Sequence, residues 1–355
     1  MTVPRSTRSA RDPWLDNARF ILIALVVFGH FLEPLAGDHA WLATTYAFVY
    51  TFHMPAFAFL SGAVAQGTAS DKLFRGVTFR LLWPFLVFQG LYALAALSPW
   101  WPDDGVTSVT TPYWLLWYLL SLAAWRMMLP LFAQLRHRMP IAVGVALLAG
   151  CFEGIGYDLS LSRTLVFFPL FLLGWSGARP WRDAGATTAI RCASVGVLAA
   201  VFAAVAWLQP DPRWLYGSYA YTLLDTGMLQ GMALRLLLLA TAAVGTLAVL
   251  ALTPRRHTWY SGFGERSLGA YVLQGFVIKL ATGAGVFAVL AAWPGIALAP
   301  VLGIAAVVLA ALLASSQVAV LLRPATAPRW LENRLWQPAN AEHAGRRRVD
   351  VSARS

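Results

Sequence analysis

Long apolar runs, each about the length of a bilayer-spanning helix, constrain this chain more than any other feature. A membrane helix needs about 20 mostly apolar residues. Ten such runs follow one another, at 17–36, 44–66, 79–98, 112–133, 140–157, 163–178, 190–208, 229–252, 267–292 and 296–322. Hydrophobic residues make up 59% of the 355 positions and charged residues only 12%, about half the charged share of a soluble domain. The sequence therefore predicts an all-α fold, a polytopic membrane helix bundle of about ten transmembrane helices.

The distribution of Lys and Arg predicts the orientation of these helices. Cytoplasmic loops carry an excess of both residues. With the N-terminus placed in the cytoplasm, only Arg163 and Arg213 fall in loops on the outer side, and nearly all other cations outside the spans lie on the inner side. We expect both termini in the cytoplasm and a location in the plasma membrane. The expected division is a basic tail at 1–16, a transmembrane domain at 17–322 and a basic tail at 323–355.

Several partners and chemistries are disfavoured by what the sequence lacks. The net charge of +11 sits in short loops between apolar runs, which indicates contact with a lipid bilayer and no nucleic acid. Cys151 and Cys192 show no metal-ligand spacing, so we expect neither a metal site nor a disulfide scaffold. The motifs for ATP hydrolysis, dinucleotide binding, zinc proteolysis and serine hydrolysis are also missing. A homo-oligomer is compatible with the sequence.

The first apolar run carries the best candidate site. Ionisable side chains within a bilayer are costly and mark function by default. Arg19 and His30 are eleven residues apart, about three helical turns, so they share one face roughly 16 Å apart along the axis. Glu33 follows His30 on nearly the same face. The structural alternatives are a snorkelling Arg19, a packing His30 and a Glu33 that caps the interface; the alignment favours function for His30.

The second run adds another histidine. His53 precedes Pro55 by two residues, and a proline inside a helix leaves a carbonyl without its partner. His53 reaches a depth similar to that of His30, so the two imidazoles would form a general base and its partner. The alternative is that His53 bonds the backbone group freed near Pro55. Ser61 and Gly62 are small residues that permit a close approach of helices.

Three cations follow the second run, and aromatic residues open the fourth. Lys72, Arg75 and Arg80 are either positive-inside charge or a site for the phosphates of a cytoplasmic donor. The stretch 114–121, with Trp117, is either an interfacial aromatic belt or the lining of a channel for a sugar or a donor arm.

Two residues are expected near the outer face. Glu153 lies late in the fifth run and Arg163 opens the sixth. They either pair across a short turn or bind an acceptor.

Several sequence blocks together point to one family. The two most specific are Asp16–Arg19 and Val26–His30; the softer ones are Phe52–Phe57, Leu60–Gly62, Trp114–Ser121, Phe167–Gly174 and Ser267–Leu273. These blocks resemble the acyltransferase type 3 family of membrane proteins, in particular its fucose 4-O-acetylase-like branch. The resemblance implies an integral membrane O-acyltransferase with about ten helices that takes acyl-CoA from the cytoplasm and modifies hydroxyl groups of sugars, glycans or related compounds.

The resemblance also assigns residues. Arg19 and His30 match the Arg-x10-His element of the family, and His53 matches its Phe-His-Met-Pro block. Lys72 and Arg75 only approximate an Arg-x-x-Arg element that often follows the second span, and Arg80 is an alternative member. Gln274 stands where many members of the branch carry a histidine.

Together these observations lead to one hypothesis with two alternatives. The hypothesis is acyl transfer, most simply acetyl transfer, from acetyl-CoA or another acyl-CoA to a hydroxyl of a sugar or glycan acceptor. His30 acts as general base or as transient acyl acceptor, Glu33 or His53 orients it, and Arg19 binds a phosphate or the thioester oxygen. The first alternative is a proton- or substrate-coupled secondary transporter that exports a glycan or small molecule. The second is a membrane partner without catalytic activity.

Overall fold

The computed structural model describes residues 12–102, 108, 110–183 and 186–336. Within these residues the regular secondary structure is helical throughout, which confirms the expected fold class. The long helices are α1 (Pro13–Leu32), α2 (Ala40–Ala63), α4 (Trp83–Ala95), α5 (Trp117–Gln134), α6 (Arg138–Leu148), α7 (Leu161–Asp183), α8 (Thr188–Leu208), α10 (Met228–Leu252), α12 (Ser267–Gly283) and α14 (Gly295–Leu313). The short ones are α3 (Asp71–Val77), α9 (Arg213–Tyr216), α11 (Ser261–Glu265), α13 (Val286–Ala291), α15 (Ser316–Leu321), α16 (Arg323–Thr326) and α17 (Arg329–Leu335).

Seven helical segments of the described chain are long and apolar enough to cross a membrane. They contain α1, the joined α3 and α4, α5, α7, α8, α10 and α14. The other three predicted runs form α2, which contains several polar residues, and the shorter helices α6 and α12. The multi-pass character is thus supported, whereas the count of ten spans and the orientation of the termini stay predictions.

Two predicted runs differ from the helices that they form. The run expected at 79–98 belongs to a helical rod that begins at Asp71, because the Ser70 side chain caps it by accepting a hydrogen bond from the Leu73 backbone N–H at 3.2 Å. Lys72 therefore lies on a helix and not in a loop. The run expected at 267–292 is divided between α12 and α13, and Gly285 between them adopts a positive φ of 74°, which glycine tolerates best.

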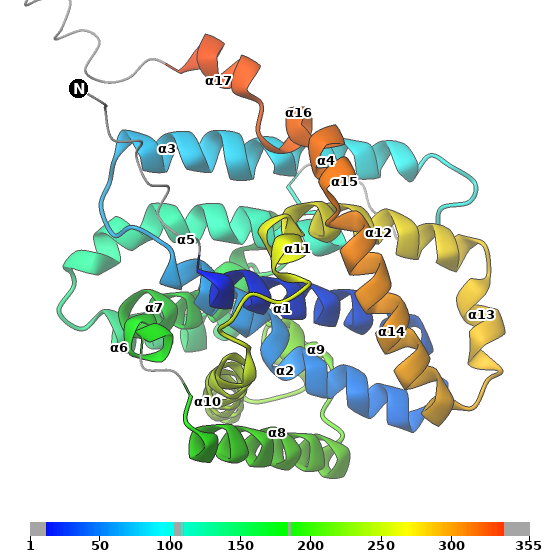
Figure 1. Cartoon of the computed structure of the whole chain (residues 1–355). Helices are drawn as coiled ribbons and strands as arrows, with labels where there is room; N and C mark the ends of the chain where they lie inside the picture. The colour runs from blue at the N-terminus through cyan, green and yellow to red at the C-terminus, as the bar shows by residue number, and fades with distance from the viewer. Residues whose placement is uncertain (1–11, 103–107, 109, 184–185, 337–355) are drawn as a thin grey trace, which may run out of the picture.

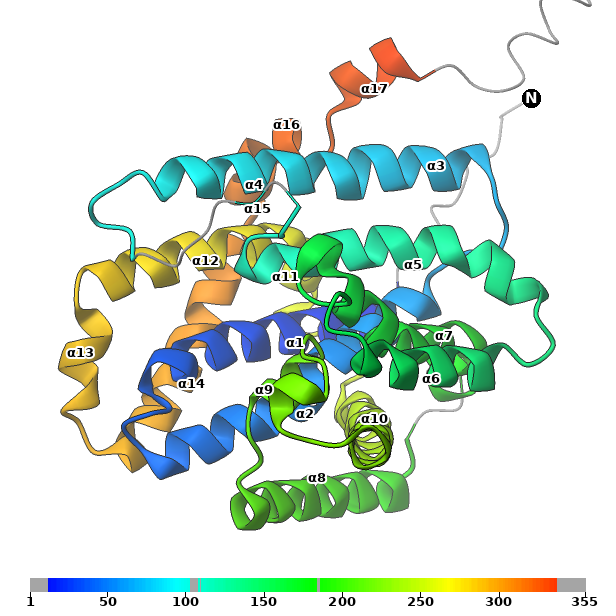
Figure 2. The same cartoon turned by 180° about the vertical axis from the view of Figure 1, so that it is seen from behind.

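The centre of the bundle is formed by α1 and α2. In both views the rod of α3 and α4 lies along one edge, α8 lies along the opposite edge, and α1 and α2 run between them (Figures 1 and 2). Helices α2 and α7 cross with their backbones in close contact, because Gly62 packs against the backbone of Phe171 and Gly174 packs against that of Phe59. The expectation that Gly62 permits close helix approach is therefore confirmed.

A buried amide fixes the start of α1. The Asn17 side chain donates to the carbonyls of Pro254 and Arg256, both at 2.9 Å, and its oxygen accepts from the hydroxyls of Thr258 and Ser261 at 2.8 and 2.6 Å. All four hydrogen-bonding positions of the amide are thereby used. This contact holds the beginning of α1 on the segment between α10 and α11, and so positions Arg19 one half-turn further on.

Candidate functional site

Two adjoining cavities form the candidate site. The larger has a volume of about 550 Å³, and its walls include His30, Glu33, His53, Trp117, Arg163 and Lys279. The smaller has a volume of about 170 Å³, and its walls include Arg19, Ser61, Arg80 and Tyr118. Val26, Met54 and Tyr271 line both cavities. The face of α1 that carries Arg19 and His30 therefore lines two adjoining cavities, with Arg19 at one and His30 at the other.

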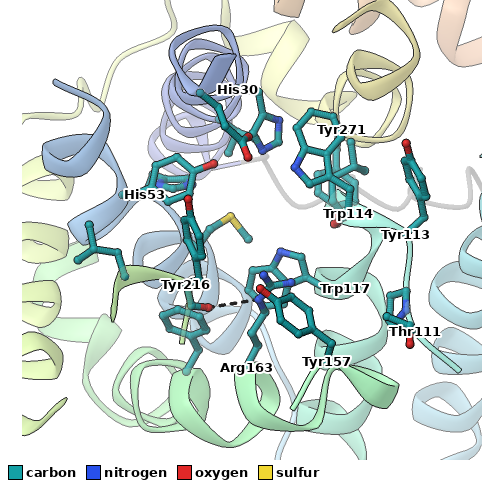
Figure 3. Close-up of a pocket in the computed structure, with 18 of the residues that line it drawn as sticks. His30, His53, Thr111, Tyr113, Trp114, Trp117, Tyr157, Arg163, Tyr216 and Tyr271 are labelled. Carbon is teal, nitrogen blue, oxygen red and sulfur yellow. Dashed lines mark hydrogen bonds between the residues drawn. The ribbon is translucent and has the colours of Figure 1, made fainter. Parts of the chain in front are cut away.

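His30 is buried in the wall of the larger cavity, with 7% of its surface exposed. Its ring lies against the indole of Trp114, with ring centroids 4.3 Å apart and planes tilted by 34° (Figure 3). The Lys279 ammonium lies 4.7 Å from the centroid of the same indole, a favourable cation–π distance. Trp114 thus contacts both the imidazole of His30 on α1 and the ammonium of Lys279 on α12.

Buried polar atoms without partners cluster around His30. The Gln274 side chain, which is fully buried, lies close to His30. Yet neither the oxygen nor the nitrogen of its amide makes a hydrogen bond of normal geometry to the described residues, and the same holds for His30 Nδ1. Unsatisfied buried polar atoms cost about 1–3 kcal/mol each, so these atoms are available to bond an ordered water, an ion or a polar ligand. Gln274 therefore lies beside His30, although it lines neither cavity itself.

His53 reaches the same cavity with a fixed orientation. Its Nδ1 lies 2.8 Å from the carbonyl oxygen of Val49. Because a carbonyl only accepts, Nδ1 carries the proton, and Nε2 is the nitrogen that can accept one. Pro55 leaves the carbonyl of Thr51 without its helical partner. His53 bonds the carbonyl of Val49 instead, so it does not satisfy the group that the proline frees.

The charged residues expected at the outer face do not pair with each other. Glu153 accepts a hydrogen bond from the Thr222 hydroxyl at 2.6 Å, and it is not in the cavity wall. Arg163 lines the larger cavity, where its Nε donates to the carbonyl of Tyr216 at 3.2 Å. Of the two alternatives, the pairing across a short turn is wrong, because the segment around α9 supplies a partner to each residue. Burial raises the pKa of the Tyr216 phenol, so this side chain stays neutral.

The remaining predicted site residues are divided by position. Glu33 follows the end of α1, where it is exposed yet lines the larger cavity with His30. Arg80 lines the smaller cavity with Arg19. Lys72 and Arg75 are exposed on α3 and line neither cavity, and Arg75 forms an ion pair with Glu332 at 3.1 Å.

One cation near the smaller cavity had no assigned role in the sequence. Arg126 of α5 lies within electrostatic range of Arg19, Arg80 and Tyr118, and its buried Nε has no hydrogen-bond partner among the described residues. Its position in an apolar run was the available signal, but the sequence does not show which helices face each other. Arg19 itself is ion-paired with Asp16 at 3.2 Å and remains partly exposed. The structure thus gathers three guanidinium groups at one end of the site.

Comparison with known proteins gives a family and distant relatives. A family model described as an acyltransferase domain matches residues 12–315. The protein named nodulation protein NolL of Sinorhizobium fredii is 36% identical over 126 residues, which cover 31% of this chain and 34% of that protein. The NolL protein of Mesorhizobium japonicum is 29% identical over 191 residues, which cover 49% and 50%. The chain thus spans at most half the length of these relatives. No solved structure shows significant similarity.

Proposed function

Since this chain belongs to the acyltransferase type 3 family of membrane proteins, we propose that it transfers an acyl group from cytoplasmic acyl-CoA to a hydroxyl of a sugar or glycan. The observation that carries the proposal is the pair of adjoining cavities. One holds Arg19, the other holds His30 and His53, and three residues line both. A donor that enters one cavity and an acceptor that enters the other would meet at Val26, Met54 and Tyr271.

The smaller cavity has the features that acyl-CoA requires. Arg19 and Arg80 line it and Arg126 lies beside them, and guanidinium groups bind phosphate oxygens through paired N–H donors. The rest of its wall is mainly apolar, with Ile23, Leu60 and similar residues. In the predicted orientation this end faces the cytoplasm. The phosphates would bind at the arginines, and the pantetheine arm would cover the roughly 16 Å between Arg19 and His30.

The larger cavity has the groups that acyl transfer requires. His30 takes the proton from the acceptor hydroxyl, and the oxygen attacks the thioester carbonyl carbon. The carbon–sulfur bond then breaks, and the thiol of CoA leaves with the proton that His30 held. The ester that forms retains the acyl group on the acceptor oxygen. A general base of this kind contributes about 10²–10⁴-fold to a rate.

Two neighbours of His30 position its ring, and a third, His53, can also accept a proton. The Trp114 ring restricts the tilt of the imidazole, and the Gln274 amide offers an acceptor or a donor to Nδ1 after a small rotation. His53 contributes a second imidazole whose Nε2 accepts protons. A proton taken from the acceptor therefore has two nitrogen bases in one cavity.

Acyl-CoA binding and acyl transfer test the proposal together. Purified protein in detergent is titrated with acetyl-CoA while its thermal unfolding is followed, and is then given ¹⁴C-acetyl-CoA with a glycan extract. We expect saturable stabilisation, weakened by Arg80→Gln and unchanged by Arg136→Gln, which alters an exposed arginine outside both cavities. We also expect label in the glycan fraction. A protein that acetyl-CoA does not stabilise, or that transfers no label, contradicts the proposal and favours a transporter.

A further inference from the structure

Arg163 is held in an aromatic frame at the wall of the larger cavity. Its guanidinium carbon lies 5.1 Å from the Trp117 ring centroid and 4.9 Å from the Tyr157 ring centroid. Its Nε donates to the Tyr216 carbonyl at 3.2 Å, the bond drawn in Figure 3. Residues from three segments, one of them only six residues before Arg163, therefore hold this side chain. Such a frame places the guanidinium before any ligand arrives, which lowers the entropy lost on binding.

The terminal nitrogens of Arg163 make no hydrogen bond or ion pair to any residue that the structure describes. A guanidinium has five N–H donors, and the bond from Nε uses one. Glu153 accepts a hydrogen bond from Thr222, and Asp158 accepts one from Thr111 at 2.7 Å. Glu33 lies in the wall of the same cavity as Arg163, but it forms no ion pair with Arg163 in the described structure. Arg163 cannot lose its charge at any ordinary pH. Cation–π contacts offset only about 0.5–2 kcal/mol of the desolvation of a cation. The Arg163 guanidinium at the cavity wall is therefore only partly stabilised by the protein, and an anion in the cavity would stabilise it further.

The cavity beside this cation has the dimensions of a small-molecule site and a partly aromatic wall. Its volume of about 550 Å³ falls within the range of about 300–1,000 Å³ of small-molecule pockets. Tyr113, Trp114 and Trp117 contribute aromatic rings to the wall. His30 lines the same space. A ligand bound to Arg163 through one group therefore has its remaining groups in the cavity that contains the proposed base.

We propose that the acceptor of this transferase carries an oxyanion, a carboxylate or a phosphate, and that Arg163 binds it. The inference rests on the proposed function and names the class of acceptor. Paired N–H donors of a guanidinium match two oxygens of either anion. The donor phosphates have their own cations, because Arg19 and Arg80 line the smaller cavity and Arg163 does not. Each substrate is thus recognised by a separate arginine site.

Binding of matched sugars tests the inference. The purified protein is titrated by calorimetry with methyl β-glucuronide, with methyl β-glucoside, which lacks the carboxylate, and with inorganic phosphate. We expect one or both oxyanions to bind at least tenfold more tightly than the neutral glucoside, and the stronger of the two identifies the anion. Arg163→Gln should weaken oxyanion binding at least tenfold, and Arg163→Lys should restore part of it. Arg213→Gln serves as the matched control, because Arg213 is exposed and pairs with Asp211 at 2.6 Å.

Acetyl-CoA titrations on the same samples separate this inference from the proposed function. Wild-type protein and all variants should keep the same acetyl-CoA affinity, which also shows that they are folded. Equal binding of the glucuronide, the glucoside and phosphate, or unchanged oxyanion binding in Arg163→Gln, overturns the oxyanion site even where acetyl-CoA binds. A wild-type protein that binds no acetyl-CoA overturns the proposed function itself.

Discussion

Replacing Asn17 by alanine should loosen the end of α1 that carries Arg19. The amide is completely buried and uses all four of its hydrogen-bonding positions. Alanine leaves the carbonyls of Pro254 and Arg256 without this donor. The hydroxyls of Thr258 and Ser261 lose less, because they lie 3.1 Å apart and bond each other.

The two carbonyls set the magnitude. An unsatisfied buried polar group costs about 1–3 kcal/mol. Both bonds are only partly buried, so water reaches the carbonyls in part, and we expect a loss of about 2–4 kcal/mol in the free energy of unfolding. Domains are commonly stable by only about 5–15 kcal/mol. Asn17→Asp should cost at least as much, because a carboxylate oxygen would face the two carbonyls in place of the amide N–H groups.

Unfolding in mixed micelles measures the effect. The free energy of unfolding is obtained by titration with sodium dodecyl sulfate, followed by tryptophan fluorescence, for Asn17→Ala, Asn17→Asp and the control Asn333→Ala. Asn333 is exposed on α17, and its loss should change stability by less than about 0.5 kcal/mol. Wild-type stability in Asn17→Asp would refute the assignment of the amide N–H groups as donors that hold α1 in place.

Three further predictions follow from the packing and the site. Gly62→Ala places a methyl group against the backbone of α7 and should lower stability by about 1–3 kcal/mol or more, whereas Gly76→Ala meets no atom within 4 Å; equal melting temperatures would contradict the close helix contact. Arg126→Met should raise the KM for acetyl-CoA by about tenfold or more with little change in kcat, because it removes one charge-assisted hydrogen bond of about 1.5–3 kcal/mol. Steady-state kinetics measure both constants, and a lower kcat alone would place Arg126 outside the donor site. Gln274→Leu should leave thermal stability unchanged or raised, because it removes a buried amide that has no hydrogen bond of normal geometry to the described residues. It should also lower kcat, and an unchanged kcat would show that the amide does not position His30.

The part of the site that lies on one helix was predictable from the sequence. The spacing of Arg19 and His30 fixes their common face, since helical periodicity depends on local geometry alone. The structure adds that this face lines two adjoining cavities. The fold class followed in the same way from the length and apolarity of the runs.

The rest of the site depends on contacts between segments far apart in sequence. Arg126 lies within electrostatic range of Arg19 and Arg80 because the fold packs α5 against the segment Thr78–Leu82, which carries Arg80. Arg163 takes its partner from Tyr216, which is 53 residues away. Neither pairing leaves a periodic signal in the sequence. Lys72 and Arg75 line neither cavity. The sequence could not show this, because charge and spacing do not indicate which side of α3 faces a cavity.

The central claim is that His30 performs the acyl transfer at the junction of the two cavities. The most direct measurement is the rate of ¹⁴C-acetyl transfer to acceptor by His30→Ala, beside His137→Ala as the control for an exposed histidine outside both cavities. We predict a fall of about 10²–10⁴-fold for His30→Ala, with acetyl-CoA affinity retained, and wild-type rates for His137→Ala. A His30→Ala protein that binds acetyl-CoA and transfers acetyl at the wild-type rate would contradict the claim.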